Sequence, residues 1–485
     1  MTKENALGIQ KINIKVLIVK IICFTIIIES IFMVLALKHK QCTPYNTLDY
    51  QQNLSQQLQQ VEHYIDTQQY KLAMDLYLKL NLDNNSNYSF NINKYHRLIA
   101  EFKKVLISDV EYYTSINDNE KALNILNNYQ KYYICDNEIT ELKETIENHI
   151  NTKNLVEYTG EIEHLFTHCL LAFPELALNP KNNMSKDFDR DCLTPSEFKK
   201  ILLSLYNNDY ILIDINSAFE NKNGVTYKKK LYLPKGKKPL IFSFDDCNYD
   251  SKKRNKGMVD KIILDRNNQL ATYTSKQTIA DRVSYDNEFI PILEQFVKTH
   301  PDFSHKGAKG LICLTGYDGI LGYRTQKTNA TSRYEIKKAK EVVNALKKSG
   351  WTFACHSYGH YHMKKLNDME FAKEINYWVN EVEPIIGKTN IYVYPYGEWE
   401  VVDDNGEITY KHQLLLDSGF QLFCGVGADG YYGYIPIGTK TKHTLLMDRK
   451  PIDGRTLRNF KERYQHLFDC EQVYDNVNRT IPYHQ

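Results

Sequence analysis

The sequence predicts an α/β protein built around a parallel (β/α) barrel, deformed or incomplete, that follows a small all-α domain and an N-terminal transmembrane helix. Three observations support this fold class. Short apolar runs alternate with amphipathic helical patterns from about residue 155 onward. Residues 41–150 show only helical patterns and almost no glycine or proline. Residues 16–37 are apolar except at four positions.

Residues 1–40 are expected to form a cytoplasmic tail and a membrane anchor. Residues 21–37 make an apolar run of 17 residues, the lower limit for a helix that spans a bilayer. Glu29 near its centre costs about 2.5–3.5 kcal/mol on insertion, which the surrounding large apolar side chains can offset. Because the run is N-terminal, long and followed by a polar region, a membrane segment is favoured over a buried helix of a soluble protein. No clear small-residue cleavage site follows, so an uncleaved anchor is expected. The expected topology is a single-pass protein of the cell membrane with the later domains outside.

Residues 41–150 are predicted to form a small helical domain or stalk. Two amphipathic helix pairs are expected, with breaks near residues 66–69 and 117–119. The plan loosely resembles tetratricopeptide-type helical hairpins, and it makes this region a candidate surface for a protein partner. The net charge of the whole chain is only +2, from 61 basic and 59 acidic residues, which argues against a nucleic-acid partner.

Residues 155–475 are predicted to form the barrel domain. Helical patterns separate most of the expected strands, and Thr194 and Pro195 mark one helix start, while Gly350 and Gly387 mark helix ends. Continuous apolar strands between helices indicate a parallel sheet that is covered on both faces. Seven or eight units fit a barrel, and a doubly wound open sheet is the alternative. The expected strands are IEHLFTHCL, YILIDI, PLIFSFDD, KGLICLTG, WTFACHSY, IYVYPYG, QLFCGV and TLLMDRK.

Chemically active side chains stand at the ends of several of these strands. Asp245 and Asp246 end one strand, His356 and His360 follow another, and His168 lies near the end of the first. Because the carboxyl ends of parallel strands meet on one face of such a fold, these groups are expected to converge.

Two histidines and a carboxylate form a three-ligand site for a divalent metal with open positions. Of the adjacent aspartates, one can bind the metal while the other accepts a proton from water. Each motif alone is also compatible with loop histidines or a solvated turn. The convergence of all of them on one face favours a metal site.

The motifs LIFSFDD, HSYGH and YVYPYGE resemble the first three motifs of the polysaccharide deacetylase (NodB-homology) family of carbohydrate esterases, over roughly residues 156–475. The resemblance implies a deformed β/α barrel that removes acetyl groups from N-acetylhexosamine polymers with a divalent metal, zinc foremost, with cobalt or nickel as alternatives. Asp245 would be the catalytic base, and a backbone N–H near Tyr396, beside Pro395, would help hold the oxyanion. The implied metal ligands are Asp246, His356 and His360.

Two departures from the family pattern concern the catalytic acid and an arginine. The arginine that precedes the proline of the third motif is missing from residues 391–394, and Arg449 on a late strand is the candidate substitute. No late Leu-x-His motif supplies the acid. HLFTHCL resembles the first strand of a subgroup with permuted motifs, which gives the acid role to His168, with a core histidine as the alternative. Tyr358 and Trp399 are expected near the substrate.

The expected function is metal-dependent hydrolysis of N-acetyl groups on a cell-surface polysaccharide, an action on carbon–nitrogen bonds of amides other than peptides. Two rivals stay open. One is a catalytically inactive glycan-binding member of the same fold with a helical protein-interaction domain. The other is a helical scaffold in which the barrel is secondary. The retained aspartate and histidine set argues against lost chemistry, because a glycan binder needs no metal triad.

Overall fold

The structure is a computed structural model of the chain that describes residues 47–80, 92–116, 118–129, 132–133, 136–152, 155–275, 278, 281–427, 432–436 and 443–479. It divides into two compact units, residues 1–105 and 106–485, which are described separately. The predicted membrane segment, residues 21–37, lies outside the described residues. Within the described ranges, no helix combines the length and apolar character that crossing a bilayer requires.

The described part of the first unit is helical. Helices α2 (Thr47–Asp66) and α3 (Tyr70–Lys79) pack against each other, and α4 (Ile92–Ser115) begins in this unit. The break between α2 and α3 falls where the sequence predicted it. Buried Val61, Ile65 and Met74 form part of its core, which is the stripe expected of an amphipathic pair.

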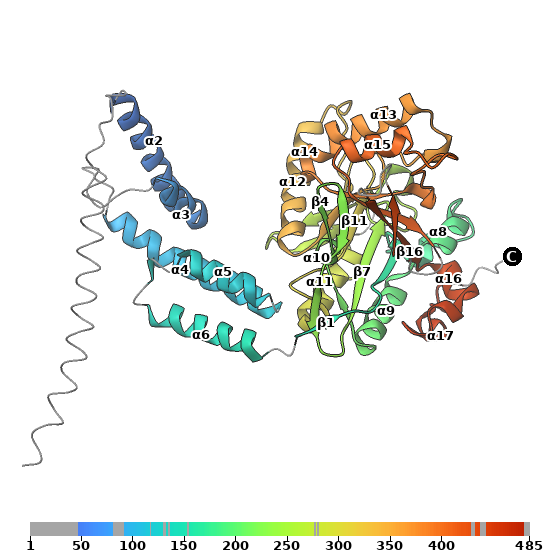
Figure 1. The fold of residues 1–485 in the computed structure, drawn as a ribbon, viewed down its shortest axis with the longest axis horizontal. Helices are drawn as coiled ribbons and strands as arrows, with labels where there is room; N and C mark the ends of the chain where they lie inside the picture. Colours follow the sequence, from blue (N-terminus) through green and yellow to red (C-terminus); the bar gives the residue numbers. More distant parts are fainter. Residues whose placement is uncertain are drawn as a thin grey trace, which may run out of the picture. The chain divides into compact units, whose positions relative to one another are not determined.

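The second unit contains the barrel. In the described part of the chain, seven strands pair in parallel in the order β14-β13-β12-β11-β7-β2-β16, and β16 also pairs in parallel with β14. That last pairing closes the ring, so the open-sheet alternative is wrong and the barrel prediction is confirmed. Figure 1 shows the barrel strands β7, β11 and β16 among the surrounding helices. The strands are β2 (Glu163–His168), β7 (Lys238–Asp245), β11 (Leu311–Leu314), β12 (Thr352–Cys355), β13 (Ile391–Val393), β14 (Leu422–Val426) and β16 (His443–Pro451).

Side chains of β7 show why a run of apolar residues forms a barrel strand. Alternate residues point to opposite faces of a strand. Ile241 joins the apolar cluster of the barrel interior, and Asp245 continues that inner face. Phe242 and Phe244 point outward, where Phe244 stacks on Phe289 with ring centroids 3.9 Å apart. Both faces are therefore buried, as the unbroken apolar pattern predicted.

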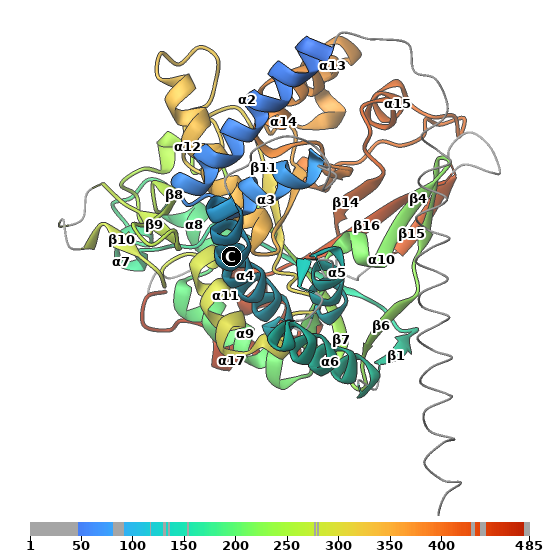
Figure 2. The same ribbon diagram turned by 90° about the vertical axis from the view of Figure 1, so that its left-hand side faces the viewer.

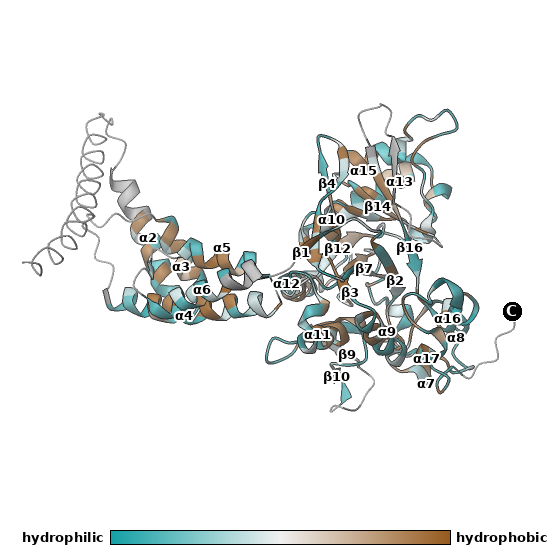
Figure 3. Cartoon of the chain, turned by 60° about the horizontal axis from the view of Figure 1, so that its bottom comes forward, coloured by the Kyte–Doolittle hydropathy of each residue, from teal (hydrophilic) through white to brown (hydrophobic). Residues whose placement is uncertain are grey.

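Helices cover the outside of the ring. Thr194 caps α9 (Pro195–Asn207) in a capping box with Glu197, which confirms the predicted helix start. The helix predicted to end at Gly387 is interrupted, because α13 (Asp368–Tyr377) passes through a π-helical turn at Trp378–Val382 into α14 (Glu383–Ile386). Figure 3 shows hydrophobic residues along the strands and on parts of α9 and α11. The other covering helices are α11 (Phe289–Thr299), α12 (Ser332–Lys348) and α15 (Tyr410–Asp417).

Several elements depart from a regular barrel. The short strand β3 (Tyr210–Leu212) pairs in parallel with the start of β7, on the edge where β11 pairs farther along β7. Strands β4, β5 and β15 extend the sheet beside β16 (Figure 2), while β8, β9 and β10 form a separate sheet. The bounds are β1 (Leu155–Tyr158), β4 (Phe219–Lys222), β5 (Val225–Lys228), β6 (Leu231–Pro234), β8 (Lys261–Leu264), β9 (Leu270–Tyr273), β10 (Val283–Ser284) and β15 (Tyr432–Pro436). The remaining helices are α5 (Asn119–Tyr129), α6 (Asn137–Thr152), α7 (Pro174–Ala177), α8 (Ser185–Asp191), α10 (Ile215–Ala218), α16 (Gly454–Asn459) and α17 (Cys470–Val473).

Candidate active site

Three predicted ligands meet at the carboxyl ends of the barrel strands. Asp246 follows β7, and His356 directly follows β12. With His360 they offer donor atoms that all lie within 4.8 Å of one another. The Oδ1 atom of Asp246 is 3.6 Å from Nε2 of His360. This arrangement can hold a metal ion, as the aspartate and histidine motifs predicted.

Hydrogen bonds behind the ligands orient them. Nδ1 of His356 lies 2.9 Å from the carbonyl oxygen of Val393, so Nδ1 carries the proton and Nε2 is left as a donor to a metal. Ser357 Oγ accepts the backbone N–H of His360 at 2.9 Å, and Glu374 accepts the N–H of Gly359 at 2.6 Å. The donor set and its supports therefore fit a divalent cation such as zinc.

Backbone strain gathers at this site. Asp246, Ser357, His360 and Tyr396 adopt left-handed conformations with φ of 58°, 56°, 54° and 58°. Such conformations cost non-glycine residues about 1–3 kcal/mol each and persist only where the surroundings enforce them. The two histidines are therefore brought together by a strained loop, with ring centroids 4.9 Å apart, and not by a helix.

Asp245 and Arg449 form a fully enclosed ion pair. Arg449 is 0% exposed, and its guanidinium donates to both carboxylate oxygens of Asp245 at 2.7 and 2.9 Å. It also donates to Ser243 Oγ and to the carbonyl oxygen of Gly425, and it lies 4.2 Å from the Phe166 ring centre. Arg449, the candidate substitute for the missing third-motif arginine, is thus the direct partner of Asp245.

Charges around the site hold both aspartates in the ionised form. Burial raises the pKa of Asp245, but the Arg449 guanidinium and His356 outweigh it and leave that pKa below its usual value. Burial likewise raises the pKa of Asp246, and Lys253 and His360 reverse that effect. Burial lowers the pKa of His360 to about 4, which favours the neutral imidazole that a metal requires.

His168 ends β2 directly beside Asp245 in the parallel register. Its Nδ1 atom lies 2.9 Å from the carbonyl oxygen of Asp191 and can donate a proton to it. That bond engages Nδ1, so Nε2 is the nitrogen that would carry the proton that a general acid gives up. The side chain is half-buried, so it is not enclosed as a core histidine would be.

The third motif forms a turn beside the histidines. Pro395 is buried, whereas Tyr396 is exposed and its ring stacks on His362, with centroids 3.9 Å apart. The edge of the His360 ring also meets Tyr396 at 4.7 Å. The backbone of Tyr396 is therefore anchored next to the ligand set.

The two predicted substrate aromatics differ in their surroundings. Trp399 is partly exposed near the end of β14, where the space beside Gly425 adjoins its indole. Tyr358 stacks on Tyr377 and donates its hydroxyl to Glu381 at 2.8 Å. Substrate contact stays a prediction for both, and the Tyr358 hydroxyl is already engaged within the protein.

The sequence motifs do not predict some residues of the site. Lys253 lies 3.7 Å from Asp246 through its Nζ atom, although it stands in a loop of ordinary basic character. Ser243 was visible as part of the LIFSFDD motif and could have been assigned to the inner face by its period-two spacing from Asp245. Glu374 and His362 belong to loop and helix segments that give no comparable signal.

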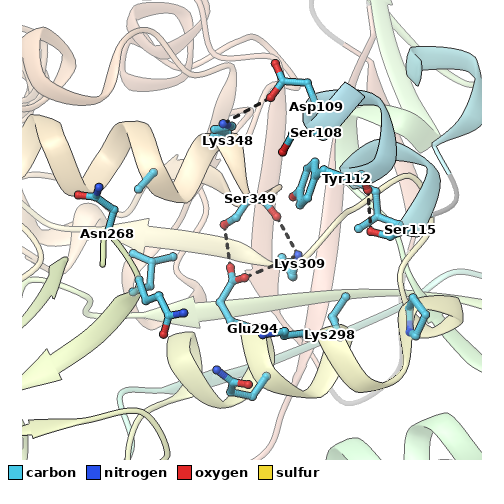
Figure 4. A pocket seen from close by; sticks show the side chains of 17 residues that line it. Ser108, Asp109, Tyr112, Ser115, Asn268, Glu294, Lys298, Lys309, Lys348 and Ser349 are labelled. Atoms are coloured by element: carbon cyan, nitrogen blue, oxygen red, sulfur yellow. Dashed lines mark hydrogen bonds and ion pairs between the residues drawn. The ribbon is translucent and has the colours of Figure 1, made fainter. Parts of the chain in front are cut away.

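A separate hollow of about 680 Å³ lies within the second unit at the opposite ends of the strands. Lys309, which precedes β11, donates to the carbonyl oxygen of Ser349, which precedes β12 (Figure 4). Glu294 accepts from the Ser349 hydroxyl at 2.7 Å. This hollow contains none of the predicted site residues, and its central polar groups bond to one another.

Comparisons with known proteins agree with the motifs. Residues 323–406 match the family profile described as polysaccharide deacetylase. This segment includes His356, His360 and Tyr396. No curated protein matches the chain.

Two solved structures are similar to the chain at low identity. One is the Streptococcus pyogenes deacetylase PplD in complex with acetate, with 14% identity and a TM-score of 0.32 over 62% of this chain and 95% of that one. The other is a Mycobacterium smegmatis protein assigned to the polysaccharide deacetylases, with 15% identity and a TM-score of 0.22 over 33% and 44%. At these TM-scores neither similarity supports an argument about fold or function. The comparison with known proteins therefore rests on the family profile, beside the geometry of the site.

Proposed function

We propose that this chain, a member of the polysaccharide deacetylase family, removes N-acetyl groups by hydrolysis from an N-acetylhexosamine-containing polysaccharide of the cell surface. One observation carries the proposal: the Asp246, His356 and His360 donor set adjoins a buried, ionised Asp245. A divalent cation on these ligands, zinc foremost and cobalt or nickel as alternatives, would supply Lewis acidity that polarises an acetamide carbonyl and acidifies water.

Side chains and one backbone group of this chain perform the remaining steps. Asp245 accepts a proton from the attacking water, and Arg449 keeps that carboxylate ionised and in place. The backbone N–H of Tyr396 donates to the carbonyl oxygen as negative charge develops on it. His168 gives a proton to the departing nitrogen, with its ring oriented by the Asp191 carbonyl. The products are acetate and a free amine on the sugar.

The rival, an inactive glycan-binding member, derives from the missing third-motif arginine. Arg449 supports catalysis instead, because it holds both oxygens of Asp245 from another strand. We further propose that residues 21–37 anchor the chain in the cell membrane and that the barrel acts outside the cell, with residues 41–150 available to a protein partner. The apolar N-terminal run supports the anchor.

The test is acetate release from an N-acetylglucosamine oligomer by the full chain purified in detergent, with metal content measured on the same preparations. Asp245→Asn should keep the metal and lower the rate by about 10²–10⁴-fold, as general acid–base groups do. His168→Ala should behave similarly. Asp245→Asn should alter the acidic limb of the pH–rate profile, and His168→Ala the basic limb.

An exposed histidine gives the matched control. His466 is paired with Glu163 at the start of β2, away from the ligand set, so His466→Ala should leave rate and metal unchanged. Full activity in Asp245→Asn would sink the assignment. Full activity in His168→Ala would remove only that residue from the mechanism.

A further inference from the structure

Lys253 is a cation beside the proposed metal ligands that the reaction described above does not use. It is the last residue of the 3₁₀ turn Ser251–Lys253, which follows β7. Its Nζ atom lies 3.7 Å from Oδ2 of Asp246, and the two side chains are 18% and 20% exposed. At that distance the contact is an ion pair and not a hydrogen bond.

The turn that carries Lys253 is held firmly. Oδ1 of Asp250 accepts the backbone N–H groups of Lys252 and Lys253, at 2.6 and 3.3 Å. Asp318 accepts the N–H of Ser251 at 2.6 Å. Tyr317 donates its hydroxyl to the other oxygen of Asp250 at 3.0 Å. The ammonium therefore faces Asp246 from a fixed backbone, not from a loose surface loop.

The two oxygens of Asp246 face different partners. Oδ1 lies 3.6 Å from Nε2 of His360, on the side of the ligand set, while Oδ2 faces the Lys253 ammonium. A carboxylate can bind a metal through one oxygen or through both. The Lys253 ammonium at Oδ2 makes metal binding through both oxygens unfavourable. A metal at Oδ2 would displace the ammonium from its ion pair and place two positive charges side by side.

We propose that Lys253 is a positioning residue that holds Oδ2 of Asp246 and thereby restricts Asp246 to one oxygen for the metal. This inference rests on the proposed function, since it assumes that Asp246 binds a metal. Catalytic metal sites keep positions open for water and substrate. Lys253 thus keeps one more coordination position open for water or substrate, and it lowers the affinity of the site for the metal.

Loss of the ammonium should strengthen metal binding for two reasons that act in the same direction. The negative charge of Asp246 is no longer offset by the ammonium, and its second oxygen becomes available. In Lys253→Met we expect zinc to bind at least about tenfold more tightly, because removing a nearby positive charge lowers the electrostatic cost of binding a dication. We expect kcat to fall, because a position that water or substrate would use is filled.

The experiment titrates zinc into the metal-free full chain in detergent, against a competing chelator, and measures acetate release at saturating zinc. Lys253→Arg keeps the charge and should bind zinc within about threefold of wild type, less than the usual effect of losing such a partner. Lys252→Met is the matched control, because that exposed neighbour lies in the same turn and should change neither quantity. Thermal unfolding of each metal-free variant checks that the fold is intact.

The outcomes separate this inference from the proposed function. Tighter zinc with a lower kcat in Lys253→Met supports the positioning role, because a purely structural defect would weaken both. Unchanged or weaker zinc binding in Lys253→Met overturns it while the metal site itself stands, provided that His360→Ala still loses zinc. Absence of zinc binding in the wild-type chain overturns both the metal site and this inference.

Discussion

Replacing Arg449 by methionine should strongly destabilise the barrel. The side chain is 0% exposed and makes two charge-assisted hydrogen bonds to Asp245, with further bonds to Ser243 and Gly425. Removal of one partner of such a pair leaves a buried charge without compensation, which costs about 3–5 kcal/mol. We expect Arg449→Met to lose that amount of unfolding free energy, measured by urea denaturation with a chelator present so that metal binding does not contribute.

A double-mutant cycle isolates the pair. Asp245→Asn alone leaves the arginine without its carboxylate, so it should also destabilise the fold. The double variant removes both charges and should lose clearly less than the sum of the single losses, by about 0.5–3 kcal/mol, as expected for residues in direct contact. Arg455 is the matched control, because it is 46% exposed and lies 3.7 Å from Asp453. Arg455→Met should change stability by no more than about 0.5 kcal/mol.

The reasoning fails if Arg449→Met stays within about 1 kcal/mol of wild type, since a typical single hydrogen bond is worth that much. It also fails if the two single losses add without coupling. Either result would mean that water or a rearranged side chain compensates Asp245. In that case Arg449 could not be the residue that orients the proposed base.

Three further predictions concern pH, metal and topology. Burial raises the pKa of the Glu288 carboxyl to about 8. The folded state therefore keeps this proton at pH values where the unfolded state has lost it. The free energy of unfolding should fall by up to roughly 1.4 kcal/mol per pH unit between pH ~4.3 and ~8. Glu288→Gln keeps an oxygen for the Leu170 and Phe289 N–H groups but does not titrate, so it should lack this fall. Urea unfolding of both proteins from pH 5 to 9 measures the slope, and an equal slope would contradict the prediction. The wild-type chain should hold about one zinc, and His360→Ala should lose most of it by elemental analysis, whereas equal contents would place the site elsewhere. Protease added to intact cells should degrade the barrel, and protection until lysis would place it in the cytoplasm.

The strands of the barrel could be predicted because each is buried on both faces. A run such as LIFSFDD is apolar at every position except those that reach the site, and that pattern survives without any knowledge of its neighbours. The sharing of one edge of β7 by β3 and β11 could not be predicted, because it depends on the pairing of β7 and not on the β3 sequence. The π-helical turn before α14 falls just ahead of Pro384, and the helical pattern of the sequence does not by itself reveal it.

The site shows the same division between local and distant information. Asp245 and Asp246 are adjacent, and His356 and His360 are four residues apart, so short motifs reveal them. Arg449 could only be named as a candidate, because its partner is 204 positions earlier in the chain. Lys253 is near Asp246 in sequence, yet its role depends on a turn whose direction is set by side-chain contacts.

The closure of the barrel by β16 determines when during synthesis the proposed enzyme becomes complete. β16 is the last strand in the described part of the chain and lies between β14 and β2. It carries Arg449, so a nascent chain that ends before it has made every proposed metal ligand but no counter-ion for Asp245. Arg479, still later, clamps Glu197 with two bonds of 2.7 Å and holds the carbonyl oxygens of Asp189 and Cys192, on either side of the Asp191 carbonyl that orients His168. A chain that stops short of these two arginines therefore lacks the contacts that align the proposed base and the proposed acid, which would make hydrolysis depend on both of these late residues.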